Sequence, residues 1–134
     1  MLTRSFLCPL VCLLSWPALA SAEPPRDLIL ITIDTIRADH LGCNGSTREA
    51  TPHLDRLARE GVNFTRARSP VPLTLPAHAS ILTGNYPPRH TVRSNGEYRL
   101  PDAQISLAEV LRERRYKTAS FVGSFVLDSR FGLA

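Results

Sequence analysis

Cysteine is scarce in this sequence of 134 residues, and two of its three cysteines, Cys8 and Cys12, fall within the first 22 residues. Those residues have the pattern of a cleavable leader, so Cys43 is the one cysteine expected in the mature chain. A single thiol cannot form an internal disulfide. The sequence therefore excludes a small secreted scaffold held together by disulfides.

Aromatic residues are also few, at 7% of the chain, and no run of like charge is present. A nucleic-acid surface needs a basic stripe, and a single-strand binder also needs aromatic side chains for stacking. Here the arginines alternate with acidic residues, which is typical of solvated helix faces. We expect no nucleic-acid partner.

The sequence lacks an apolar run long enough for a good membrane span, and it lacks internal repeats. The first 22 residues have one basic residue, an apolar centre interrupted by Pro9 and Pro17, and an A-x-A pattern that ends at Ala22. This pattern predicts a signal peptide over residues 1–22 and a secreted or periplasmic protein without stable membrane insertion after cleavage. An uncleaved anchor is the alternative.

About 112 residues, 23–134, remain after cleavage, which is within the size range of one domain. The chain ends directly after an apolar segment, so we expect residues 23–134 to be the N-terminal part of a longer domain. Apolar runs at 27–34 and 117–127 predict buried strands, and 62–68 predicts a shorter one.

Helix signals separate these runs. Thr51 and Pro52 predict a helix start and Gly61 its end, while Ser106 and Glu109 form a capping-box pattern. Strands that alternate with helices indicate an α/β fold with a mostly parallel central sheet flanked by helices.

Asp34 closes the first apolar run. Ligands of open α/β sheets bind outside the carboxyl ends of the strands, and a carboxylate there suits a divalent cation. The alternative is that Asp34 caps the next turn together with Thr35.

The segment "VPLTLPAHASILTG", residues 71–84, poses a similar choice for Thr74. Pro76 fits the first turn of a helix that Gly84 would end, so Thr74 could cap that helix. The alternative is a nucleophile next to the positive end of the helix dipole, activated by a base or a metal. His78 lies one turn further along and could bind or protonate substrate oxygens.

Four ordered segments, "LILITIDTIRADHLGCNG", "TPHLDRLAREGVNFTRARS", "TLPAHASILTGNYPPRH" and "ISLAEVLRERRYKTASFVG", resemble the N-terminal part of the sulfatases, a family of the alkaline phosphatase superfamily. The resemblance implies an alkaline-phosphatase-like α/β catalytic domain with a metal site at strand ends. It places Asp34 and Thr35 on two adjacent metal-binding aspartates of the family. It also places Thr74 on the Cys or Ser that becomes formylglycine, and His78 on an arginine.

The resemblance implies an exported metal-dependent hydrolase of sulfate esters, or of phosphate esters because Thr74 replaces the convertible residue. Asp34, Thr35 and Thr74 are the expected metal-facing residues, with Thr74 and His78 catalytic. The cation would be calcium, or zinc or manganese, and the substrate a small-molecule or glycan ester. Ser124 and Val126 stand where the family has a substrate-binding Lys and His. A non-catalytic binding domain, or a phosphodiesterase or phosphotransferase of the superfamily, are the alternatives.

Overall fold

The computed structural model describes residues 27–48 and 50–133, so the predicted signal peptide lies outside the described residues. The chain divides into two compact units, residues 1–32 and 33–134. The described part of the first unit, residues 27–32, has neither helix nor strand.

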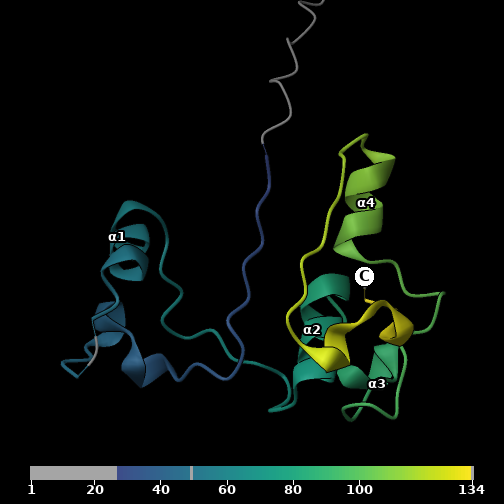
Figure 1. Ribbon diagram of the computed structural model, residues 1–134, viewed down its shortest axis with the longest axis horizontal. Coiled ribbons are helices and arrows are strands. Elements are labelled where there is room, and N and C mark those ends of the chain that lie inside the picture. The colour runs from purple at the N-terminus through teal and green to yellow at the C-terminus, as the bar shows by residue number, and fades with distance from the viewer. Residues whose placement is uncertain (1–26, 49, 134) are drawn as a thin grey trace, which may run out of the picture. The chain divides into compact units, whose positions relative to one another are not determined.

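Four α-helices and four 3₁₀ turns form the described part of the second unit (Figure 1). The α-helices are α1 (Pro52–Glu60), α2 (Thr74–Thr83), α3 (Pro87–His90) and α4 (Leu107–Glu113). The 3₁₀ turns are η1 (Ala38–His40), η2 (Gly42–Asn44), η3 (Phe125–Leu127) and η4 (Ser129–Phe131).

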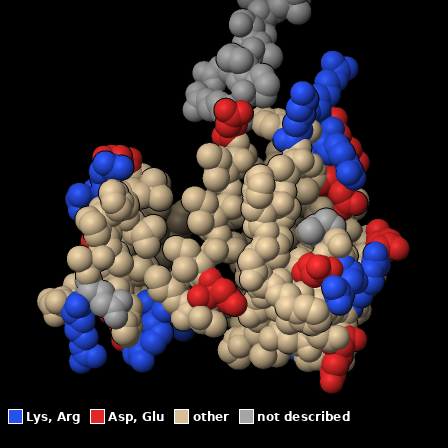
Figure 2. Space-filling model, in the orientation of Figure 1, with Lys and Arg blue, Asp and Glu red and all other residues tan. Residues whose placement is uncertain are grey.

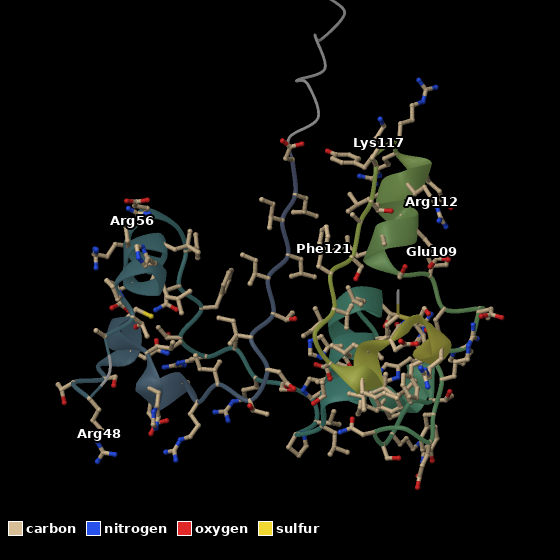
Figure 3. The ribbon with its side chains drawn as sticks, viewed as in Figure 1. Arg48, Arg56, Glu109, Arg112, Lys117 and Phe121 are labelled. Carbon is tan, nitrogen blue, oxygen red and sulfur yellow. The ribbon has the colours of Figure 1, made fainter. Side chains whose placement is uncertain are left out.

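The predicted sheet is not confirmed, because none of the described residues is in a strand. Most apolar side chains of the three segments predicted as strands lie at the surface, with Ile29 80%, Phe64 76% and Phe121 98% exposed, whereas Val126 of the last segment packs against the core. Figure 3 shows Phe121 on the segment that follows α4. A strand exists only through ladder hydrogen bonds to a neighbouring strand, and these segments do not pair with one another. The last of them forms η3 instead over its final three residues.

Helix α1 has the predicted ends, with Pro52 in its first turn and Gly61 at its C-cap. Thr51 precedes it but does not cap it through the side chain. The Thr51 hydroxyl instead accepts a hydrogen bond from the Gly42 backbone N–H and donates one to Asp55, each over 2.9 Å. Asp55 also accepts from the Cys43 backbone N–H over 2.7 Å. These three hydrogen bonds hold η2 against the start of α1.

Helix α4 begins with the predicted capping box. The Ser106 hydroxyl accepts from the Glu109 backbone N–H over 3.3 Å, and the Glu109 carboxylate accepts from the Ser106 backbone N–H over 2.7 Å. The bond from the Ser106 backbone N–H, and a second from the Ser106 hydroxyl over 2.8 Å, lower the pKa of the Glu109 carboxyl. Two of the otherwise unpaired donors of the helix start are thereby satisfied.

The apolar core of the second unit gathers around α2. Its fully buried side chains come from α2, from the loop after α3 and from η4: Leu75, Ala79, Val92, Leu100 and Phe131. The Leu100 backbone N–H donates to the Phe131 carbonyl over 2.9 Å, which holds η4 against that loop. Helix α2 is therefore the most firmly packed element around the predicted site.

Candidate active site at the start of helix α2

Thr74 is the first residue of α2 rather than its cap, which corrects the capping alternative for this residue. Leu73 occupies the N-cap position and offers no side-chain hydrogen bond. Gly84 ends the helix as predicted, with a left-handed backbone at φ 68°. The hydroxyl of Thr74 is consequently available for another partner.

That partner is Asp34, which lies 40 residues earlier in the chain. The Thr74 hydroxyl donates towards both carboxylate oxygens, with 3.1 Å to Oδ2 and 3.4 Å to Oδ1. Asp34 is exposed and Thr74 is half-buried, so the pair is open to solvent on one side. The structure thus brings together two of the four residues that the sequence singled out.

Thr35 directly follows Asp34 in the same turn and has a left-handed backbone, with φ 56°. A β-branched residue is an outlier in that region, and a strained residue of this kind costs about 1–3 kcal/mol. The described contacts join Asp34 to Thr74 but do not include the Thr35 hydroxyl. Thr35 therefore shapes the turn that carries Asp34.

His78 is nearly buried, and its ring folds back onto the helix. Its Nδ1 lies 2.8 Å from the carbonyl oxygen of Thr74. A carbonyl can only accept, so Nδ1 carries the hydrogen and donates it. The contact places the imidazole beside the backbone of Thr74, next to the predicted nucleophile.

Asn95 caps α2 from a distant turn, a role that the sequence had not indicated. Its side-chain oxygen accepts from the Leu75 backbone N–H over 2.9 Å. The Asn95-Gly96 turn was predicted, and Gly96 has the left-handed backbone of such a turn, with φ 79°. The Asn-Gly pair was the only sequence signal for this residue, because it marks the turn without naming what the side chain reaches.

The start of α2 offers few backbone donors to an anion. Leu75 donates to Asn95, and Pro76 has no N–H. Ala77 donates to the Leu73 carbonyl over 3.0 Å. Stabilisation of negative charge here therefore depends on the helix dipole and on groups outside the backbone.

A divalent cation fits the donor chemistry of Asp34 and Thr74 in part. A carboxylate and a hydroxyl are the oxygen ligands that hard cations accept, and the two groups already lie together. Within residues 27–48 and 50–133, no group of three or more His, Cys, Asp or Glu side chains is placed to hold a metal. A complete site would need ligands in addition to these two.

His90 supports α2 from α3 and was not singled out by the sequence. It is fully buried, and the Val92 backbone N–H donates to its Nδ1 over 3.2 Å. Its Nε2 therefore carries the hydrogen and donates to the Ser80 hydroxyl over 2.9 Å. Burial lowers the pKa of His90, which favours the neutral ring that this pattern requires.

An apolar hollow of about 520 Å³ lies elsewhere in the second unit, between α1 and the segments on either side of it. Its walls include Ile33, Ile36, Leu54, Leu57 and Val62, but neither Asp34 nor Thr74. On the face shown in Figure 2, basic and acidic side chains lie close to one another. The Asp34–Thr74 pair therefore lies outside the hollow, and the pair is open to solvent on one side.

The sulfatase family model matches residues 26–127, which is most of the chain. The chain belongs to the sulfatase family. A steryl-sulfatase of Mus musculus is 40% identical over 114 residues, covering 77% of this chain and 18% of that protein. An ulvan-active sulfatase of Formosa agariphila is 40% identical over 107 residues, covering 79% and 20%. Human arylsulfatase A is 38% identical over 105 residues, covering 75% and 20%.

This sulfatase-family chain spans about a fifth of the length of the curated relatives that it matches. No solved structure matches it. Family membership implies the alkaline-phosphatase-like α/β fold, of which the described helices form a part. No helix among the described residues is long and apolar enough to cross a membrane.

Proposed function

We propose that the chain is the nucleophile-bearing part of an exported sulfatase-family hydrolase, in which Thr74 attacks the sulfur or phosphorus of an ester. The hydrogen bond of 3.1 Å from the Thr74 hydroxyl to the Asp34 carboxylate carries this proposal. A hydroxyl is a weak nucleophile unless a neighbouring group takes its proton or lowers its pKa. Asp34 is a neighbour of that kind.

The reaction has two steps. In the first, the Thr74 hydroxyl gives its proton to the Asp34 carboxylate, and its oxygen forms a bond to sulfur or phosphorus while the bond to the leaving alkoxide breaks. The leaving oxygen takes a proton from Nε2 of the protonated His78 ring, while Nδ1 keeps its hydrogen bond to the Thr74 carbonyl. In the second step, water attacks the ester on Thr74 and gives one proton back to His78, Asp34 returns its proton to the Thr74 oxygen, and hydrogen sulfate or hydrogen phosphate is released.

Asp34 and Thr74 would together hold a divalent cation, with Thr35 in the same turn and with further ligands from the rest of the protein. When bound, such a cation supplies positive charge that lowers the pKa of the Thr74 hydroxyl and offsets the charge of the transition state. This role matters because the start of α2 has few backbone donors to spare.

The family supports sulfate esters as substrates, on a small molecule or a glycan, as in the sulfatases that this chain matches. Thr74 itself favours a second class of substrate. Threonine carries a methyl group that the formylglycine precursors lack, so we expect it to remain unmodified. Ser124 and Val126 also offer no cation to a sulfate group. We therefore propose phosphate mono- or diesters as the alternative substrates, which includes the phosphodiesterases and phosphotransferases of the superfamily.

The test uses the full-length protein purified with its natural complement of metal. Aryl sulfate, aryl phosphate and aryl phosphodiester hydrolysis are measured in parallel for the wild type and for Thr74→Ala and Thr74→Ser. We expect Thr74→Ala to lose at least about a hundredfold in kcat and Thr74→Ser to retain activity. Mass spectrometry of the quenched wild type should show the sulfuryl or phosphoryl group on Thr74.

A binding domain without catalytic activity is the competing proposal, and the same two residues, Ser124 and Val126, favour it. If wild type and Thr74→Ala hydrolyse all three substrates at the same negligible rate, the hydrolase proposal is wrong. Saturable binding of the intact ester by both proteins would then support the binding domain.

A further inference from the structure

A hydroxyl at a helix start is normally used for capping. A threonine at the N-cap position accepts a hydrogen bond, through its side-chain oxygen, from the backbone N–H two or three residues further along, which satisfies a donor that the helix leaves unpaired. The hydroxyl of Thr74 is instead directed to Asp34. Leu73, at the cap position, has no polar side chain to replace it.

Asn95 supplies the missing acceptor. Its side-chain oxygen lies 2.9 Å from the backbone nitrogen of Leu75, the residue directly after Thr74. Asn95 is itself exposed, but the donor that it satisfies belongs to a fully buried residue of the core. Without Asn95, that N–H would lose its partner at the point where α2 must be well ordered.

The turn that carries Asn95 is held by contacts of its own in addition to the bond with Leu75. The Ser94 hydroxyl donates to the Glu97 carboxylate over 2.9 Å, across the tip of the turn. On the side of α3, fully buried Val92 anchors the chain three residues before Asn95. The side-chain oxygen of Asn95 is therefore presented by a chain that is tied at both ends.

We propose that Asn95 is a positioning residue for the reaction of Thr74: by accepting from the backbone N–H of Leu75, the next residue, it fixes the first turn of α2 and with it the direction of the Thr74 hydroxyl towards Asp34. Asn95 does not touch the reacting atoms. The proposal rests on the proposed function, since it gives Thr74 the role of nucleophile.

The test compares Asn95→Ala and Asn95→Asp in the full-length protein. Aspartate keeps an oxygen acceptor of the same reach, whereas alanine removes it. We expect kcat to fall about tenfold in Asn95→Ala with KM changed less than about twofold, because misplacement of a nucleophile lowers kcat specifically. Asn95→Asp should recover most of kcat. Arg93→Ala is the control from the same loop, because this exposed side chain takes no part in the Asn95 contact, and it should retain the wild-type kcat.

A second measurement does not depend on activity. Hydrogen exchange of the Leu75 amide should become about fivefold faster in Asn95→Ala and remain near the wild-type rate in Asn95→Asp. If Asn95→Ala does not fold, Asn95→Gln gives the same test, because its amide oxygen is displaced by one methylene.

Two results would overturn the positioning role: a kcat of Asn95→Ala within twofold of the wild type, or an Asn95→Asp variant as impaired as Asn95→Ala. Failure of the proposed function is recognised separately, by full turnover in Thr74→Ala. Faster exchange at Leu75 in Asn95→Ala together with full turnover would show a cap that is only structural, and would also refute the positioning role.

Discussion

The imidazole of His90, the last residue of α3, contacts α2 through one nitrogen and the loop after α3 through the other. Its Nε2 lies 2.9 Å from the hydroxyl of Ser80 on α2, and its Nδ1 accepts from the backbone N–H of Val92. The Ser80 hydroxyl in turn donates a hydrogen bond to the Pro76 carbonyl over 3.0 Å. One neutral ring thus connects the end of α3 to the first turn of α2, which carries the candidate site.

The state of His90 makes stability depend on pH. Burial lowers its pKa in the folded protein below the ordinary value of 6.5, so the folded state binds the proton less readily than the unfolded state does. The contribution of the neutral ring is fully present above pH 6.5 and is lost as the pH falls through the lower folded pKa. Thermal unfolding between pH 5 and 8 should show a falling melting temperature below about pH 6.5.

The variant His90→Phe separates this effect from other titrations. It should destabilise the protein by about 1–3 kcal/mol at pH 7.5, because the Val92 N–H loses its acceptor inside the core. Its melting temperature should also vary less between pH 5 and 7 than that of the wild type. An unchanged pH profile in His90→Phe would show that another group is responsible.

Metal binding should depend on Asp34. Asp34→Asn should weaken the affinity for the divalent cation by at least about tenfold, since the substitution removes the charge of a proposed ligand. Metal content after dialysis against a buffered series of the free ion measures this without reference to activity. Asp39→Asn is the control, because Asp39 is a nearby exposed acid that pairs with Arg37 over 2.6 Å. Equal losses in both variants would refute a specific role for Asp34.

Gly42 should be needed for the contact between η2 and α1. A methyl group at this position would collide with the carboxylate of Asp55, which holds the Thr51 and Cys43 groups. Gly42→Ala should therefore lower the free energy of unfolding by about 1–3 kcal/mol in a denaturant titration. The control Gly123→Ala has open space around the added carbon and should change it by less than about 0.5 kcal/mol.

The exposed apolar segments should become strands in the full-length protein. Residues 28–33 and 119–122 are rich in aliphatic or aromatic side chains that are exposed here, which is what a strand buried on both faces would show before its neighbours are added. Hydrogen exchange of the full-length protein should find these amides protected. Rapid exchange throughout both segments would contradict the predicted sheet.

Local signals predicted α1, α2 and α4 but not the short helix α3. The Thr51-Pro52 start, the Gly61 and Gly84 ends and the Ser106–Glu109 box are all present, because each depends on residues within a few positions of one another. The sheet could not be obtained in the same way. A strand requires a partner strand that can lie far away in the sequence, and none of the described residues forms such a pairing.

The candidate site was predictable only in part. Asp34 and Thr74 were singled out separately, one by its place after an apolar run and the other by its place before Pro76. The bond between them crosses 40 residues and is a property of the tertiary structure. The same is true of Asn95, whose side chain could equally have closed its own turn. The sequence therefore indicated the candidate reactive residues Asp34 and Thr74 but not Asn95, which we propose holds Thr74 in place.

The left-handed backbone of Thr35 costs folding free energy in the turn that carries Asp34. Asparagine accepts this conformation more readily than threonine, so a search for more heat-resistant variants would select Thr35→Asn, with a gain of up to about 1 kcal/mol. Thr35 is also one of the proposed metal-facing residues, and this substitution would replace its hydroxyl with an amide. Under the proposed function, the Thr35→Asn variant would therefore gain thermal stability and lose turnover through the same substitution.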